Sequence, residues 1–276
     1  MTSHLVDRLV RRVTTLVGDR LVVRVMRRMT AISGYDRALA LASQAFVALV
    51  PAILVISEGL GGSGRLTELA SSLGFSPSAA DTVGGLLERP SADHSLTALG
   101  WVLLVVSVLG FVRSLQRAYS AAWNLPSTGI RGYARSLLVS AALVLELAVL
   151  VLLAPLLGWL VGSPVVSLVA YAVTALILWW PIQFLLLRGR VGWQALLPGA
   201  AVTGAGQALL VTASGFIVPV TASRAAERLG LLGVATVVLS WLVVLGVLLV
   251  VSAVLGAELA QTTGTADDPE ETDDPA

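Results

Sequence analysis

The sequence contains two pairs of arginines at a spacing suited to binding phosphate. In each pair the residues are four positions apart, so they lie one above the other on a helix; the pairs are Arg113 with Arg117 and Arg131 with Arg135. Guanidinium groups form charge-assisted, often bidentate hydrogen bonds with phosphate oxygens. Two interpretations stay open: a cytoplasmic site for anionic lipid headgroups, or positive charge that anchors the ends of two membrane helices.

Polar side chains inside apolar runs form a second group. Glu146 lies in the run LVLELAV, and a carboxyl group at such a depth faces a bundle interior or a water-filled cavity. It is either a functional site, for a proton or a cationic group, or a protonated carboxyl hydrogen-bonded to a neighbouring helix. Gln44, Gln183 and Gln207 are expected to hydrogen-bond between helices, whereas Glu258, near a span end, is expected to reach water. The candidate headgroup or substrate site comprises Arg113, Arg117, Arg131, Arg135, Glu146 and Gln183.

Catalytic chemistry finds little support in the residue inventory. The pattern Gly59-x-Gly61-x-x-Gly64 resembles a dinucleotide fingerprint, but no strand precedes it, so we interpret it as a flexible exit from a membrane helix. The chain has no cysteine and no lysine, and its histidines, His4 and His94, are predicted to lie on opposite sides of the membrane. We therefore predict no catalytic residues, no cofactor, no metal site and no enzymatic activity.

The amino-acid composition indicates whether the chain folds in water or in a lipid bilayer. Of the 276 residues, 56% are hydrophobic and only 13% are charged, with a mean hydropathy of +0.87. Soluble domains carry about 25% charged residues. A water-soluble core of this size cannot bury so many apolar side chains, so the sequence predicts a membrane protein.

Six apolar segments are each long enough to cross a hydrocarbon core of ~30 Å as a helix. They comprise residues 37–58, 96–113, 136–162, 165–187, 194–217 and 231–257. The fold class is therefore an all-α polytopic membrane protein with six transmembrane helices. In the fifth segment Ala200, Gly204 and Ala208 follow a small-xxx-small spacing, which predicts close approach of another helix.

Charge placement predicts that both termini are cytoplasmic. Residues 1–35 carry seven arginines and two aspartates, whereas the loop 59–95 carries two arginines and four acids. Arginine-rich segments stay on the cytoplasmic side. The predicted loop 218–230 fits this rule least well, because Arg224 and Arg228 lie beside Glu227.

Three regions follow from these patterns. Residues 1–35 form a basic amphipathic segment, which either lies on the inner membrane surface or packs on cytoplasmic loops. Residues 36–260 form the six-helix membrane domain, with two short helices in its outer loop 59–95. Residues 261–276 form a disordered acidic tail.

Several stretches resemble the YihY/BrkB family of bacterial inner-membrane proteins, at one time labelled ribonuclease BN. They are DRALALASQAFVALVPAILVI (36–56), FVRSLQRAYSAAWNLP (111–126), WQALLPGAAVTGAGQALL (193–210) and the apolar run 230–259 with its terminal Gly-Ala-Glu. The resemblance implies a six-helix fold in the bacterial plasma membrane and a part in envelope integrity. The ribonuclease label finds no support, since the chain shows no metal-ligand cluster and no soluble nucleic-acid domain.

Two functions are weighed. One is transport or flipping of a lipid or another amphiphile through a polar cavity in the bundle, with anionic membrane lipids as partners. The other is a non-catalytic membrane scaffold that recruits a protein partner for envelope biogenesis. No nucleic acid is expected as a partner, and no oligomeric state is predicted.

Overall fold

The computed structural model describes residues 21–59, 94–126, 137–146, 149 and 163–262. Every regular element among these residues is a helix. The helices are α2 (Gly34–Gly59), α5 (His94–Ala122), α7 (Pro164–Leu186), the 3-10 helix η1 (Gln194–Leu196), α8 (Leu197–Leu229) and α9 (Leu231–Thr262). Residues 21–31 and 137–146 are also helical. The predicted all-α class is thus confirmed for the described chain.

Four of the described helices are long and apolar enough to cross a membrane. These candidate spans are Gly100–Ala122, Val165–Leu186, Gln194–Leu229 and Leu231–Thr262. Helix α2 has 26 residues, about 39 Å at 1.5 Å per residue, and contains Pro51. Of the predicted third span, the structure describes Leu137–Glu146 as a short apolar helix and little more. A count of six spans therefore stays a prediction.

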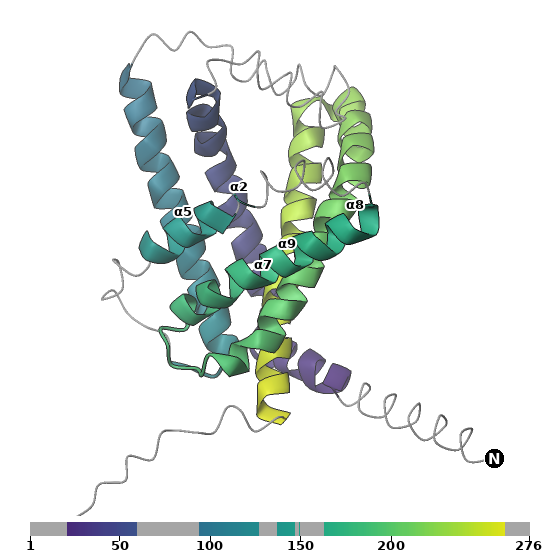
Figure 1. Ribbon diagram of the computed structural model, residues 1–276. Helices are drawn as coiled ribbons and strands as arrows, with labels where there is room; N and C mark the ends of the chain where they lie inside the picture. Colours follow the sequence, from purple (N-terminus) through teal and green to yellow (C-terminus); the bar gives the residue numbers. More distant parts are fainter. Residues whose placement is uncertain (1–20, 60–93, 127–136, 147–148, 150–162, 263–276) are drawn as a thin grey trace, which may run out of the picture.

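The long helices form one bundle (Figure 1). Helix α5 packs on α2, α2 on α9, α9 on α8, and α8 on α7, while α5 also touches α9 and α7. Figure 1 shows α7 running obliquely across the other long helices. The helix 21–31 and the end of α9 lie together at one end of the bundle (Figure 1). The first and last described segments therefore share an end, and that this end is cytoplasmic stays a prediction.

Small residues let the helix backbones meet. A Cβ atom on Gly204 would lie 2.7 Å from a carbonyl oxygen of α7, and a Cβ atom on Gly256 would lie 2.8 Å from the Cα of Gly199 on α8. Real Cβ atoms do not approach so closely, so no larger residue fits without moving a helix. Ala200 and Ala208 are buried on the same side of α8 as Gly204. The packing role predicted from the small-xxx-small spacing is confirmed.

The prediction of a loop over residues 218–230 is wrong. Helix α8 continues without a break to Leu229, and only Gly230, at φ 56°, separates it from α9. The sequence SRAAERL is polar, but alanine, arginine and glutamate are strong helix formers, so polarity there does not mark a loop. The predicted start of the fifth segment at residue 194 agrees with the candidate span Gln194–Leu229, in which η1 runs directly into α8. Pro198 lies in the first turn of α8, where proline loses no hydrogen bond.

The connection from α7 to α8 is a tight turn with an aromatic cluster. Arg188 and Gly189 adopt positive φ angles of 59° and 67°. The Trp193 ring lies 4.9 Å from that of Trp180 and 5.2 Å from that of Phe184, between centroids. The Trp180 indole nitrogen also donates to the Trp193 carbonyl oxygen at 2.8 Å. These contacts hold η1 against the end of α7, which places the first turn of α8.

The described part of the basic N-terminal segment has two different faces. Val25 is buried against the bundle, whereas Val22, Val23 and Met26 are 59%, 64% and 65% exposed. The helix 21–31 therefore packs on the protein with one side and presents apolar side chains on the other. Packing on the protein is thus observed, while contact with the membrane surface stays a prediction. Of the predicted tail 261–276, the first two residues are the last of α9. The helices predicted within 59–95, residues 1–20 and residues 263–276 lie outside the described residues.

Candidate functional site

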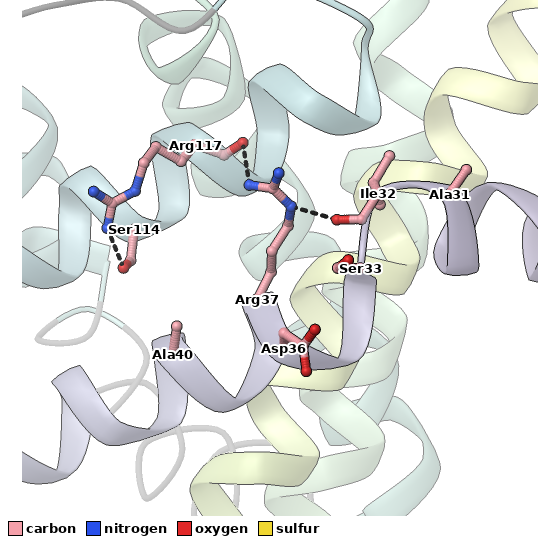
Figure 2. A pocket seen from close by; sticks show the side chains of 8 residues that line it. All are labelled: Ala31, Ile32, Ser33, Asp36, Arg37, Ala40, Ser114 and Arg117. Carbon is pink, nitrogen blue, oxygen red and sulfur yellow. Dashed lines mark hydrogen bonds between the residues drawn. The ribbon is translucent and has the colours of Figure 1, made fainter.

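A pocket lies at the end of the bundle where the helix 21–31, the start of α2 and the end of α5 meet (Figure 2). Its volume is about 420 Å³, within the range of small-molecule sites. Its lining combines small and polar residues with charged ones: Ala31, Ile32, Ser33, Asp36, Arg37, Ala40, Ser114 and Arg117. The pocket thus joins the junction between the helix 21–31 and α2 to the end of α5, which is far away in the sequence.

Arg37 holds the walls of this pocket together. Its Nε donates to the Ile32 carbonyl oxygen at 2.7 Å, and its Nη1 donates to the Arg117 carbonyl oxygen at 3.2 Å (Figure 2). Ile32 follows the helix 21–31, where Ser33 turns the chain with φ 52°. The planar guanidinium suits two acceptors at once, so Arg37 links the N-terminal helix, α2 and α5.

Arg117 supplies the exposed cation of the pocket. One of its terminal nitrogens donates to the Ser114 hydroxyl oxygen at 2.9 Å, which orients the guanidinium while the side chain remains exposed. An arginine has five N–H donors, so this bond leaves most of them for a ligand or water. Asp36, in the first turn of α2, is the acid of the pocket. With Arg37 and Arg117 against Asp36, the lining carries two positive charges and one negative charge.

Of the four arginines predicted to form the headgroup site, only Arg117 lines the pocket in the described part of the chain. Arg117 lines the pocket, while Arg113, one turn earlier on α5, is half-buried and not among the lining residues. Arg131 and Arg135 lie outside the described residues. The predicted convergence of all four therefore remains untested. Asp36, Arg37 and Ser114 join Arg117 in the pocket, although nothing in the arginine spacing pointed to them.

A separate cluster of buried polar side chains joins four helices in the bundle core. The Trp179 indole nitrogen of α7 donates to the Tyr119 hydroxyl of α5 at 3.1 Å. The Thr203 hydroxyl of α8 donates to the Ser252 hydroxyl of α9 at 2.9 Å, and both hydroxyls also hydrogen-bond Tyr119. All four side chains are at most 2% exposed. Satisfied polar groups of this kind fix how helices fit together.

Gln183 belongs to the same region and links α7 to α8. The surrounding donors and acceptors orient its amide so that the oxygen accepts from the Ala200 backbone nitrogen at 3.1 Å and from the Trp179 indole at 2.9 Å. Its nitrogen then donates to the Leu196 carbonyl oxygen at 3.2 Å. These contacts confirm the predicted interhelical hydrogen bonding of Gln183. Its part in a substrate site stays a prediction.

Glu146 faces the protein interior, as predicted. Its side chain is 4% exposed and hydrogen-bonds the side chain of Gln207 on α8. Neither Glu146 nor Gln183 lines the pocket around Arg117. The candidate residues chosen from the sequence therefore divide between the pocket at the end of the bundle and the bundle core.

The expectation that Glu258 reaches water is wrong. The whole residue is 7% exposed, and its Oε1 lies 2.9 Å from the Nη1 of Arg28, while its Oε2 lies 3.6 Å from the Nε of Arg24. The same Arg28 nitrogen donates to the Gln261 side-chain oxygen at 3.3 Å. Arg24 and Arg28 are one helical turn apart, so both reach the carboxylate from one face of the helix 21–31. The position of Glu258 near the end of a span did not predict that Arg24 and Arg28 would pair with it.

The described helices, four of which are long and apolar enough to cross a membrane, are those of an α-helical membrane protein. The sequence model of the family described as Virulence factor BrkB matches residues 25–275, and the chain belongs to that family. This confirms the resemblance drawn from the sequence. No curated protein and no solved structure matches the chain.

Proposed function

We propose that this protein is a non-enzymatic, multi-pass protein of the bacterial plasma membrane that binds phosphate-bearing lipids and moves or positions them for envelope integrity. The observation that carries the proposal is the pocket at the arginine-rich end of the bundle, with the exposed guanidinium of Arg117 oriented by Ser114. Arginine forks bind phosphate oxygens strongly, and the predicted cytoplasmic position of this end would place the pocket among the phosphate headgroups.

The exposed surface of α5 offers a place for the acyl chains. Val106 and Leu103 are 11 and 14 positions before Arg117, so helical spacing puts them on the same side of α5. They are 61% and 48% exposed in the protein. A lipid with its phosphate at Arg117 would lay its chains along these residues. The proposed route therefore follows the outside of α5, because the bundle core is closely packed around Tyr119 and Gly204.

Lipid copurification tests this proposal. Arg117→Gln should lower the amount of bound phospholipid several-fold, because it removes the exposed charge but keeps a polar side chain. Arg27→Gln is the matched control, since Arg27 is exposed on the helix 21–31 and does not line the pocket. Titration with anionic vesicles, zwitterionic vesicles and inorganic phosphate separates a lipid site from a phosphate site. Equal lipid retention by both variants would overturn the proposal.

The scaffold function has its own supporting observation, the exposed apolar face of the helix 21–31 with Val22, Val23 and Met26. A protein partner or the membrane surface would cover such a face. Val22→Ser with Met26→Ser should then abolish complementation of an envelope defect while lipid copurification is unchanged. If Arg117→Gln abolishes complementation and this double variant does not, lipid binding is the better account.

A further inference from the structure

Glu146 occupies a position where an ionised carboxylate is costly. It lies in the apolar helix Leu137–Glu146, and its side chain is 4% exposed. Removing a charge from water without a partner charge is among the most unfavourable events in protein folding. The carboxyl therefore needs either a cation beside it or a proton of its own.

The groups that face Glu146 come from three neighbouring helices. They are Gln207 of α8, which hydrogen-bonds it, and the phenols Tyr119 of α5 and Tyr171 of α7, which lie close enough to interact electrostatically. No arginine is among these described neighbours. The described partners are thus neutral groups, and they do not compensate a negative charge.

The hydrogen bonding between Glu146 and Gln207 leaves one acceptor atom on each side chain without a donor. The two side chains hydrogen-bond each other, yet Oε1 of Glu146 and Oε1 of Gln207 are both buried without a donor. A carboxylate and an amide oxygen are both acceptors, so an ionised Glu146 leaves both unsatisfied. A proton on the carboxyl supplies the missing donor. The acid O–H then donates to the amide oxygen, while the amide N–H donates to the acid carbonyl.

We propose that Glu146 is a proton-binding site, in which the bound proton completes a reciprocal carboxylic acid–amide pair with Gln207 and joins the helix 137–146 to α8. Loss of the proton removes one of the two hydrogen bonds and places a charge in a neutral environment. Tyr119 also hydrogen-bonds Trp179, Thr203 and Ser252. Proton release would therefore act beside the point where α5, α7, α8 and α9 meet. This proposal does not depend on the headgroup pocket.

Infrared spectroscopy of the full chain in lipid nanodiscs tests the proposal. At pH 7, where an exposed glutamate is ionised, the wild type should show the carbonyl band of a protonated carboxylic acid. The band should disappear in Glu146→Gln and persist in Glu227→Gln, the matched control, because Glu227 is exposed on α8. Gln207→Leu should shift its frequency, since the amide partner is lost. An identical spectrum for the wild type and Glu146→Gln would overturn the proposal.

Thermal unfolding from about pH 5 to about pH 9 gives a second readout. A proton bound more tightly in the folded chain stabilises the fold at low pH, and that stabilisation is lost as pH rises. Glu146→Gln should abolish this part of the pH dependence, because a glutamine amide makes the same reciprocal pair at every pH. Failure of Glu146→Gln to fold would also contradict the proposal, since the neutral amide should replace the neutral acid.

Discussion

Arg28 and Glu258 are 230 positions apart in the sequence, and their side chains form an ion pair of 2.9 Å. Both side chains are largely buried, at 12% and 10% exposure. The pair ties the helix 21–31 to the end of α9. Ala31 and Ile32, where that helix ends, form one wall of the pocket around Arg117. The ion pair therefore holds in place a wall of the proposed headgroup site, although neither residue lines it.

A double-mutant cycle should reveal this coupling. Glu258→Gln leaves two arginines, Arg24 and Arg28, without their carboxylate, and should cost about 3 kcal/mol of unfolding free energy. Arg28→Gln should cost less, because Arg24 still neutralises Glu258. The double variant should be more stable than the sum of the single losses predicts. Thermal unfolding in detergent measures each value, with Arg27→Gln as an exposed control. Strictly additive losses would show that the pair contributes nothing.

Substitution of the contact glycines should separate the helices. Gly204→Ala and Gly256→Ala place a methyl group within 2.8 Å of a neighbouring backbone, so each should lower stability by about 1–3 kcal/mol. Gly215→Ala is the matched control, because nothing lies within 4 Å of its added Cβ. Since alanine favours a helix over glycine, the control should be neutral or stabilising by up to about 1 kcal/mol. Equal effects at all three positions would contradict the packing argument.

Removal of the Tyr119 hydroxyl should weaken the core polar cluster. Tyr119→Phe keeps the ring but removes the acceptor for Trp179 and the partner of the Thr203 and Ser252 hydroxyls. Losing a hydrogen bond whose donors keep other acceptors costs about 0.5–1.5 kcal/mol, which thermal unfolding would show as a lower midpoint, since Trp179 still donates to Gln183 and Thr203 to Ser252. Tyr35→Phe serves as control, because Tyr35 is 61% exposed. A midpoint unchanged in both variants would mean that the cluster does not stabilise the bundle.

Membrane orientation can be tested at the two ends of the α8–α9 hairpin. Leu229 precedes the turn at Gly230, and Thr262 ends α9 about 48 Å away along the helix. The chain has no natural cysteine, so Leu229→Cys and Thr262→Cys each give one labelling site. A membrane-impermeant thiol reagent applied to intact cells should label position 229 and not position 262. The reverse result would invert the predicted topology.

Segment composition alone determined that the chain belongs in a bilayer as a set of helices. A bilayer requires each spanning segment to be apolar and to satisfy its own backbone hydrogen bonds, and both conditions can be judged one segment at a time. The small-xxx-small spacing of Ala200, Gly204 and Ala208 predicted close packing for a similar reason. Only small residues permit backbone contact, so residue size itself carries the information.

Only the tertiary structure decided which side chains meet. Helices that are apolar on nearly every side do not reveal from their sequence how they are rotated in the bundle. That rotation places Tyr119, Thr203 and Ser252 in one cluster, and Gln207 against Glu146. The pairing of Glu258 with Arg24 and Arg28, which the sequence pattern assigned to water and to the membrane surface, likewise depends on how the first described helix docks on the last. Partner choice is a property of packing geometry, whereas membrane insertion is a property of each segment.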